Sequence, residues 1–372
     1  MKIGIIGTRG FPDIQGGIET HCQELYTRMA GFEGYTVTVY RRKPYLNSGN
    51  KNVKYKNIRF IDYYVPRNKF LETFLHSFLA SLHALFQKYD IIHYHNTGPG
   101  FFIPLAKISG AKVVFTYHNV SYTQQKWNRS ARRFLAKSEE VSIRRSDYII
   151  FISEFIESAM TEKYGLNSGR SEVIFNGIKI PEKAKSDDFL KDLGLEKYRY
   201  ILSVGRFLEE KGFDYMIRAY KRTGIKDIRL VLAGDTDYPT EYSYKLKKLA
   251  AENDVILPGF IKGEKLNQLF TFARLYIISS FSEGLPIALL EAMSYDLDVL
   301  ASDIPADRQV DLEETDYFKV GDEEDLSRAI IKKLSEENKR SFSEVLTVKY
   351  NWDKIVSDTM IVYKKLIKDY EN

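Results

Sequence analysis

The chain begins with KIGIIGTRG (residues 2–10), a short apolar run that ends in a glycine-rich segment and leads into a helical pattern at Ile18. The apolar run has no polar alternation, which is typical of a parallel strand buried on both faces. A strand, a glycine turn and a helix in this order make the first unit of a βα repeat. This stretch therefore predicts that a Rossmann-like sheet starts at the N-terminus.

The same alternation continues along the chain and restarts after a charged, weakly patterned segment. Strands are predicted at residues 2–7, 36–40, 91–94, 113–117 and 148–152, and again at 201–204, 230–233, 255–257, 275–278 and 299–301. Repeated βα units favour a doubly wound parallel sheet. Two sets predict an α/β fold of two Rossmann-like domains that face a central cleft. The predicted parts are residues 1–175, a linker at 176–198, a second domain at 199–350 and a final helix at 351–372.

One predicted helix carries an unusually large apolar stripe. Apolar residues recur at helical spacing between positions 71 and 86, namely Leu71, Phe74, Leu75, Phe78, Leu79, Leu82, Leu85 and Phe86. A stripe of this kind ordinarily faces the core. The spacing predicts a long helix that packs through these side chains.

Composition limits the class of protein. The chain has 372 residues, of which 44% are hydrophobic and 28% charged, and this balance fits a soluble globular protein of two domains. Cys22 is the single cysteine, which excludes an intrachain disulfide and a cysteine-based zinc site and fits a reducing compartment. No apolar run reaches the roughly 18–20 residues of a membrane span. We therefore expect a cytoplasmic protein.

Charge is distributed unevenly between the two halves. Residues 1–175 hold 24 Lys and Arg against 14 Asp and Glu, a net charge of +10, whereas the remainder holds 31 against 36, a net charge of −5. A basic half suggests an anionic partner. Basic stretches alternate with aromatic residues, which fits reversible docking on an anionic membrane surface, at the inner face of the cell membrane. The stretches are Arg41–Lys43, Lys51–Lys56, Lys126–Arg129 and Arg132–Arg133, with Tyr63, Tyr64, Phe70 and Trp127 nearby. No nucleic-acid-binding module is recognised.

The first glycine loop has two interpretations. Glycines at residues 7–17 before a helix allow backbone N–H groups to approach a phosphate. The same loop, with Arg41-Arg42 at the end of the second strand and a Tyr-x-x-x-Lys spacing at Tyr122 and Lys126, also fits an NADP-dependent reductase. The reductase hypothesis leaves the second half of the chain unexplained.

The second half holds a more specific constellation. Arg206 and Lys211 lie five residues apart where a predicted strand ends, and two cations so placed can clamp a diphosphate. Glu283 precedes Pro286, a favoured first helical residue, and Glu291 lies in an apolar helical segment. A buried carboxylate needs a partner, and sugar or ribose hydroxyls are suitable donors.

These motifs together carry a family resemblance. Gly16-Gly17, Gly205-Arg206 with Lys211-Gly212, and Glu283-x7-Glu291 occur in order, and the chain also has Thr116-Tyr117-His118, Val173–Gly177 and Trp352. Together they resemble the retaining, nucleotide-sugar-dependent glycosyltransferases of family 4 (glycosyl transferases group 1), of the bacterial polysaccharide type, with the GT-B fold. The resemblance covers nearly the whole chain. In similar proteins glycine and proline are usual at the positions of Asp296 and Asp298, and proline is common at Ser279.

The resemblance implies roles for individual residues. Arg206 and Lys211 would neutralise the donor diphosphate, Glu283 would hold donor-sugar hydroxyls, and His118 would lie beside the donor sugar and the acceptor. The last helix would cross back onto the first domain. Further donor contacts would come from Gly16, Gly17, Gly205, Gly284, Leu285, Pro286, Ile287, Glu291, Gly259, Phe260 and Ile261, and acceptor contacts from His95, Asn119 and Tyr122.

The resemblance also implies substrates and cofactors. The donor would be a UDP- or GDP-sugar, the acceptor a saccharide or a lipid-diphosphate-linked saccharide, and no cofactor or metal is expected. Asp235-Thr236-Asp237 matches a D-x-D metal motif, but metal-dependent sugar transfer belongs to a different fold. His93 and His95 share a strand face at metal-ligand spacing, without an evident third ligand. A non-catalytic module would require an incomplete site, and no key residue is missing.

Overall fold

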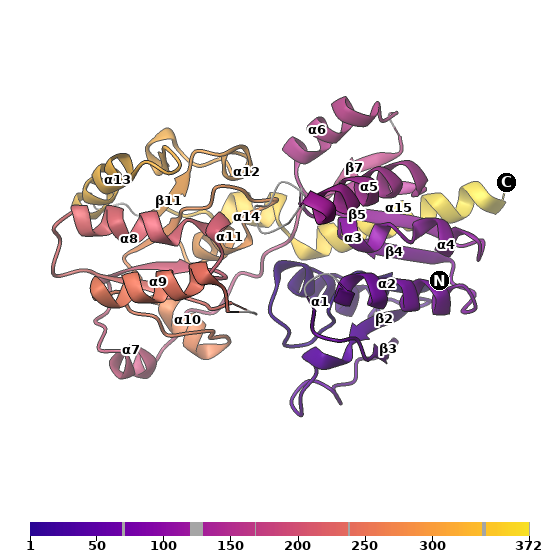
Figure 1. Ribbon diagram of the computed structural model, residues 1–372, viewed down its shortest axis with the longest axis horizontal. Helices are drawn as coiled ribbons and strands as arrows, with labels where there is room; N and C mark the ends of the chain where they lie inside the picture. The colour runs from indigo at the N-terminus through magenta and orange to yellow at the C-terminus, as the bar shows by residue number, and fades with distance from the viewer. Residues whose placement is uncertain (69–70, 120–128, 168, 237–238, 337–339, 372) are drawn as a thin grey trace. The chain divides into compact units, whose positions relative to one another are not determined.

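The computed structural model describes all residues except 69–70, 120–128, 168, 237–238, 337–339 and 372. The chain forms two compact units, residues 1–177 with 350–372 and residues 178–349. Each unit is built on a parallel sheet with helices around it (Figure 1), which confirms the predicted α/β fold with two Rossmann-like sheets.

The sheet of the N-terminal unit is parallel throughout. Its strands pair in the order β3-β2-β1-β4-β5-β6-β7 within the described part of the chain. The register sets Ile5 against Val39 on one side and against His93 on the other. The strands are β1 Lys2–Ile6, β2 Thr36–Arg42, β3 Ile58–Tyr63, β4 Ile91–His95, β5 Lys112–Tyr117, β6 Tyr148–Phe151 and β7 Ser171–Val173.

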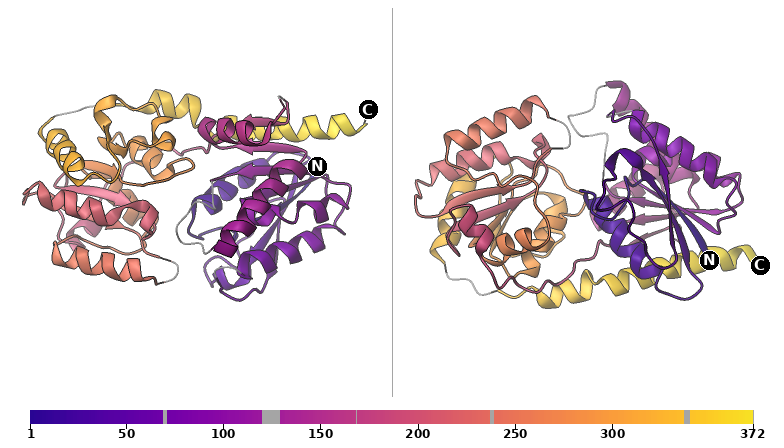
Figure 2. Two further views of the ribbon diagram at one scale, coloured as in Figure 1. Left: turned by 45° about the horizontal axis from the view of Figure 1, so that its top comes forward. Right: turned by 90° about the horizontal axis from the view of Figure 1, so that it is seen from below.

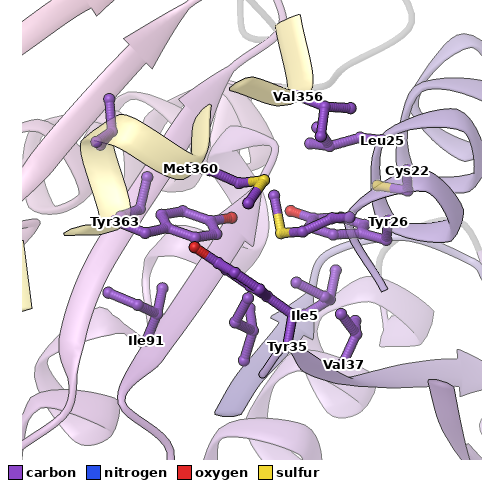
Figure 3. Packing of buried hydrophobic residues seen from close by; sticks show 14 of the residues in the cluster. Ile5, Cys22, Leu25, Tyr26, Tyr35, Val37, Ile91, Val356, Met360 and Tyr363 are labelled. Carbon is purple, nitrogen blue, oxygen red and sulfur yellow. The ribbon is translucent and has the colours of Figure 1, made fainter. Parts of the chain in front are cut away.

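One face of this sheet is covered by an apolar layer. The helices of the unit are α1 Gly17–Met29, α2 Leu71–Ala84, α3 Thr97–Gly100, α4 Ile103–Lys107, α5 Arg129–Arg145, α6 Glu154–Tyr164 and α15 Trp352–Glu371, with a 3₁₀ turn at Lys43–Tyr45. Ile5, Val37 and Ile91 of the strands pack with side chains of α1 and α15 (Figure 3). The last helix, yellow in Figure 2, therefore completes the core of the N-terminal unit.

A tryptophan anchors the start of α15. Trp352 is 6% exposed, and a Cβ added to Gly177 would lie 2.4 Å from its ring. Only glycine allows the chain to pass this close to the ring, so the end of the first segment is packed directly against the start of the returning helix.

On the other face of the N-terminal sheet a few polar groups lie beneath α2, and they reverse the predicted orientation of this helix. Arg42 Nη1 and Glu72 Oε1 are 2.5 Å apart, and Ser81 Oγ lies 2.6 Å from the hydroxyl of Tyr94. Glu72 and Ser81 are buried, whereas Phe74 is 41% exposed. The expectation that the apolar stripe packs onto the core is therefore wrong, because the sheet beneath α2 presents polar groups that need partners.

The C-terminal unit contains a smaller parallel sheet. Its strands pair in the order β12-β11-β10-β8-β9 among the described residues. The strands are β8 Tyr200–Val204, β9 Arg229–Ala233, β10 Leu275–Ile278, β11 Val299–Ser302 and β12 Tyr317–Phe318. The strand predicted at 255–257 is wrong, since this stretch is joined to the sheet through an isolated bridge between Val231 and Ile256.

Helices surround this second sheet. They are α7 Asp188–Asp192, α8 Phe213–Arg222, α9 Glu241–Glu252, α10 Glu264–Thr271, α11 Ile287–Ser294, α12 Pro305–Arg308, α13 Glu323–Ser335 and α14 Ser343–Lys349, with 3₁₀ turns at Glu209–Lys211 and Glu314–Asp316. A separate apolar core includes Leu230, Leu232 and Ile277 of the strands and Met216 of α8. Each unit thus has a core of its own.

A glycine makes the same close contact in both sheets. Gly7 follows β1 with φ 113°, and a Cβ there would lie 1.9 Å from the carbonyl oxygen of His95. Gly234 follows β9 with φ 142°, and a Cβ there would lie 1.9 Å from the carbonyl oxygen of Gly205. Both positions require glycine, and both hold a loop against the neighbouring strand at the carboxyl edge of the sheet.

None of the helices in the described part of the chain combines the length and the apolar character that a membrane crossing requires.

Candidate active site

The basic loop of the C-terminal unit leaves the sheet at the end of β8. Gly205 and Arg206 follow the strand, and the 3₁₀ turn Glu209–Lys211 leads into α8. Gly212 between them has φ 63°, and a Cβ there would lie 2.4 Å from the carbonyl oxygen of Ser279. The loop therefore lies against the end of β10, which brings Lys211 to the segment that carries Glu283.

Lys211 and Glu283 form an ion pair. Lys211 Nζ lies 2.5 Å from Glu283 Oε1, and Ser280 Oγ donates to the same oxygen at 2.6 Å. The Glu283 side chain is 13% exposed and that of Lys211 is 22% exposed. Ser279 Oγ donates to the backbone oxygen of Lys211 at 2.8 Å. Two residues that are 72 positions apart are thus held together before any ligand binds.

The segment after Glu283 leads directly into a helix. Gly284 and Leu285 precede Pro286, the N-cap of α11, and Gln309 Nε2 donates to the backbone oxygen of Gly284 at 3.2 Å. Glu291 lies in the second turn of α11, and withdrawal of its carboxyl group from water raises its pKa to about 7. A carboxyl group with this pKa changes charge in the physiological range.

A third acidic residue of this region was not predicted. Asp307 in α12 is fully buried, and neither carboxyl oxygen has a hydrogen-bond partner among the described residues. Burial raises the pKa of Asp307, the charge of Glu283 raises it further, and the charge of Lys211 opposes the rise. The sequence feature that could have identified Asp307 is its position after β11, at the same edge of the sheet as Arg206 and Glu283.

The predicted base-binding backbone lies at the same edge. Gly234 N donates to the backbone oxygen of Gly259 at 2.9 Å, and Gly205 N donates to that of Ala233 at 3.0 Å. Phe260, next to Gly259, is 48% exposed. The structure thus brings the loops that contain Gly205, Arg206, Lys211, Glu283, Gly284 and Gly259 together at the carboxyl ends of the strands, where ligands of such sheets bind.

The departures from the family pattern have structural explanations. Asp296, at a position where glycine is usual, has φ 56° and is therefore in the left-handed region that glycine adopts most easily. Asp298 Oδ2 accepts from Arg274 Nη1 at 2.7 Å. These aspartates occupy structural positions next to the site.

The glycine loop of the N-terminal unit is organised by a carboxylate. Arg9 N donates to Glu19 Oε1 at 2.9 Å. Gly16, the N-cap of α1, has φ 146°, and a Cβ there would lie 2.0 Å from Glu19 Oε2. Gly16 and Gly17 are thus at the start of α1, and Gly16 is the residue type that lets Glu19 fold back over the loop.

Histidines and tyrosines form a continuous hydrogen-bonded chain in this unit. The hydroxyl of Tyr363 lies 2.5 Å from His93 Nδ1, and the hydroxyl of Tyr26 lies 2.9 Å from the same atom and 2.6 Å from His95 Nε2. His95 Nδ1 is 3.0 Å from His118 Nε2. The chain therefore connects α15 and α1 to His118 at the end of β5.

His21 of α1 completes this cluster and was not predicted. Its ring lies 5.5 Å from that of His95 and 5.1 Å from that of His118, centroid to centroid. His21, His95 and His118 are all buried, and one ligand atom from each lies within 4.8 Å of the others, so these three imidazoles are candidates to hold a metal ion. Burial lowers the pKa of His21 to about 4 and that of His118 below its usual range, so these imidazoles are neutral at pH 7.

Comparison with known proteins identifies the family. A model described as Glycosyltransferase Family 4 matches residues 15–180, and one described as Glycosyl transferases group 1 matches residues 185–343. The chain belongs to glycosyltransferase family 4. It is 25% identical to an uncharacterised glycosyltransferase of Methanocaldococcus jannaschii, over 98% of each chain.

Two further comparisons carry information about relatives. The chain is 27% identical to the UDP-Gal:alpha-D-GlcNAc-diphosphoundecaprenol alpha-1,3-galactosyltransferase of Escherichia coli, over 65% of each chain. The structure of HepE from Anabaena in complex with UDP and glucose superposes with a TM-score of 0.78 at 17% identity, covering 98% of this chain and 100% of that one. This similarity gives the glycosyltransferase the GT-B fold.

The basic pair that favoured NADP is buried in this glycosyltransferase. Arg41 is 2% exposed and pairs with Asp62, with Nε 2.8 Å from Oδ1, while Arg42 is 5% exposed and pairs with Glu72. The expectation that these two arginines form basic surface is wrong, because both neutralise carboxylates inside the unit. Nothing supports the reductase alternative. Tyr122 and Lys126 lie outside the described residues.

Of the remaining predicted residues, some lie in the described part of the chain and others lie outside it. Asn119 follows His118 and is half-buried, at the same strand end. Asp235 Oδ1 pairs with Lys247 Nζ at 2.9 Å, while Asp237, the second acid of the D-x-D motif, lies outside the part of the chain that is described. Phe70 and Trp127 also lie outside it.

The buried histidines predict acid sensitivity of the glycosyltransferase. The folded-state pKa of His21 is about 4 and its unfolded value is about 6.5, so the unfolded state binds the proton first as the pH falls. Stability is retained above pH 6.5 and lost below it, by about 2 kcal/mol at pH 5 from His21 alone. We expect His21→Gln to reduce the acid-induced loss of stability of the N-terminal unit by this amount, measured calorimetrically at pH 7.5 and 5.0.

His83 provides the control for this measurement. Burial and the charge of Arg59 also lower the pKa of His83, but His83 is only half-buried, so His83→Gln should reduce the acid-induced loss of stability by less than His21→Gln does. Identical pH dependence in the His21→Gln and wild-type proteins would show that His21 is not held neutral by burial.

Proposed function

We propose that the protein is a retaining glycosyltransferase that moves a sugar from a UDP- or GDP-sugar to a saccharide acceptor in cell-surface polysaccharide synthesis. The observation that carries the proposal is the Lys211–Glu283 ion pair at the carboxyl edge of the C-terminal sheet, with Arg206 on the same loop. This arrangement supplies cations for a diphosphate and a carboxylate for hydroxyl groups within one site.

Donor binding exchanges the partners of the ion pair. The diphosphate would take the ammonium group of Lys211 and the guanidinium group of Arg206, which frees Glu283 to accept hydrogen bonds from sugar hydroxyls. The start of α11, after Gly284 and Leu285, adds the positive end of a helix. Glu291 would accept hydrogen bonds from the ribose hydroxyls, and the backbone at Gly259–Ile261 would contact the base of the nucleotide. Lys211 and Glu283 would therefore have polar partners both in the free protein and with the donor bound.

The barrier to transfer is the departure of the diphosphate. The bond between sugar C1 and the phosphate oxygen breaks, and negative charge builds up on the leaving group. Arg206 and Lys211 stabilise this charge where it develops. The acceptor hydroxyl forms its bond to C1 on the same face, and its proton passes to an oxygen of the departing diphosphate. We propose that no metal takes part, because two protein cations already occupy that role.

The N-terminal unit is proposed to serve the acceptor. Neutral His118, held by His95, can hydrogen-bond a sugar hydroxyl. A metal at the three histidines would have to displace the bond between His95 and His118. A lipid-diphosphate-linked saccharide is the proposed acceptor, and the name of the Escherichia coli relative, which specifies a diphosphoundecaprenol acceptor and a UDP-sugar, supports this class. Binding of UDP and glucose by HepE supports a UDP-sugar donor.

Removal of either cation tests the leaving-group role. Arg206→Ala and Lys211→Ala should each lower kcat/KM for sugar transfer by about two orders of magnitude or more, roughly 2.7 kcal/mol, because stabilisation of the departing diphosphate is lost. The measurement is steady-state transfer from the UDP- or GDP-sugar that the wild-type enzyme accepts.

Lys248 is the matched control, since it is a cation of the same unit whose side chain is 79% exposed on α9. Lys248→Ala should leave transfer unchanged. A loss below about threefold in the Arg206 and Lys211 variants, roughly 0.7 kcal/mol, would refute the role of these residues.

Glu291 predicts a pH dependence of donor binding. Its pKa of about 7 in the free protein means that the carboxylate needed by the ribose hydroxyls is mostly protonated at pH 6 and mostly ionised at pH 8. Donor affinity should therefore rise about tenfold between these pH values. Titration calorimetry with the nucleoside diphosphate checks this, and Glu291→Gln should give weaker binding with a flat profile. A steep profile in the variant would assign the titration to another group.

A further inference from the structure

The polarity of α2 is inverted relative to an ordinary surface helix. Its outward residues are apolar, with exposures of 50% for Leu71, 41% for Phe74, 38% for Phe78 and 38% for Leu82, and Phe86 just beyond the helix is 72% exposed. We refer to these five residues as the α2 apolar face. The inward residues include Glu72, His76, Ser77 and Ser81, all buried. Large apolar side chains in one row on the surface are uncommon unless the surface is covered in function.

The orientation of α2 is fixed by the sheet beneath it. Glu72 pairs with buried Arg42, Ser81 bonds to the hydroxyl of Tyr94, and His83 Nδ1 lies 2.9 Å from the hydroxyl of Tyr40. Rotation of the helix to bury its phenylalanines would leave Arg42 buried without its carboxylate, which is strongly unfavourable. The apolar residues therefore remain outside as a fixed feature of the fold.

The α2 apolar face continues onto the neighbouring helices. The ring of Phe74 lies 5.0 Å from that of Phe102 and 5.9 Å from that of Phe134 on α5, and Phe101 lies 5.1 Å from Phe134. These contacts join α2, the α3–α4 connection and α5 into one aromatic cluster, in which Phe102 is buried and Phe101 and Phe134 are half-buried. The partly exposed rings of Phe101 and Phe134 extend the apolar area beyond α2.

The charge around this surface is positive. Within α2, Leu71–Ala84, the one acidic residue is Glu72, and it is buried against Arg42. On α5, directly before Phe134, Arg129, Arg132 and Arg133 are exposed. An apolar face without exposed acids, bordered by arginines, is complementary to a layer that is anionic at its surface and apolar beneath.

We propose that the α2 apolar face, with Arg129, Arg132 and Arg133, docks the enzyme on an anionic lipid bilayer. The phenylalanines and leucines would enter the boundary between headgroups and acyl chains, and the arginines would contact lipid phosphates. A second copy of the chain fits less well, because a symmetric contact would meet the same acid-free, arginine-bordered surface. The proposal deepens the proposed function and rests on its lipid-linked acceptor, which the docked enzyme would meet in the same bilayer.

Vesicle flotation tests the proposal directly. The full-length protein is mixed with vesicles of 70% phosphatidylcholine and 30% phosphatidylglycerol, and with pure phosphatidylcholine vesicles, at 0.1 M salt. We expect at least tenfold tighter binding to the anionic vesicles, reduced at 1 M salt. A triple variant, Leu71→Ser, Leu82→Ser and Phe86→Ser, should lose at least tenfold in affinity, as should Arg132→Glu with Arg133→Glu.

Tyr244→Ser is the matched control, because Tyr244 is 67% exposed on α9 in the other unit, and its removal should leave flotation unchanged. Absence of wild-type binding, or equal binding by the triple variant, overturns the proposal. Concentration-dependent dimers that the triple variant abolishes, without vesicle binding, overturn it in favour of a second copy.

The outcome is separable from the proposed function. Thermal stabilisation by UDP or GDP reports on the C-terminal unit and should be the same in the triple variant and in the wild-type protein. Loss of flotation with retained nucleotide binding attributes the defect to the surface. Flotation without any nucleotide binding would contradict the proposed function and leave the docking surface intact.

Discussion

The close approach of a glycine to a neighbouring strand end is the constraint on which both units depend. Gly7 lies against the carbonyl of His95, and Gly234 lies against that of Gly205, and in each case a Cβ would sit 1.9 Å from the oxygen. Each contact holds the loop after one strand against the carboxyl end of the neighbouring strand in the sheet. The histidine chain in one unit and the basic loop in the other are built on these edges, so the chemistry of both sites follows from backbone packing.

The two sites hold their polar groups in different ways. In the C-terminal unit, Lys211 and Glu283 are charged and pair with each other, so an anionic ligand that takes Lys211 would leave the Glu283 carboxylate to accept hydrogen bonds from hydroxyl groups. In the N-terminal unit, burial keeps His95 and His118 neutral, and His95 is hydrogen-bonded both to His118 and to the hydroxyl of Tyr26. The first arrangement suits a diphosphate and the second suits uncharged hydroxyl groups, which matches the proposed division between donor and acceptor.

Much of the fold could be predicted because buried parallel strands are continuous apolar runs, as in residues 2–7 and 230–233. The edge strands β3, β7 and β12 were missed, since β3 alternates in polarity and the other two have three residues or fewer. The outward position of the α2 apolar side chains could not be predicted, because it depends on polar strand residues that α2 contacts, Tyr40, Arg42 and Tyr94. None of them is adjacent to α2 in the sequence. His21 was missed for a similar reason: its neighbours His95 and His118 come from two strand ends.

The most direct test of the central claim, that the C-terminal unit binds a nucleoside diphosphate through protein cations, is a thermal-shift series with UDP, GDP, ADP and NADPH, with and without Mg²⁺. Ligand at about 100-fold over its Kd stabilises by roughly 2.7 kcal/mol, which raises the unfolding temperature by several degrees. We expect a shift with one nucleoside diphosphate that Mg²⁺ does not change. A shift with NADPH alone, or a nucleotide shift that requires Mg²⁺, would contradict it.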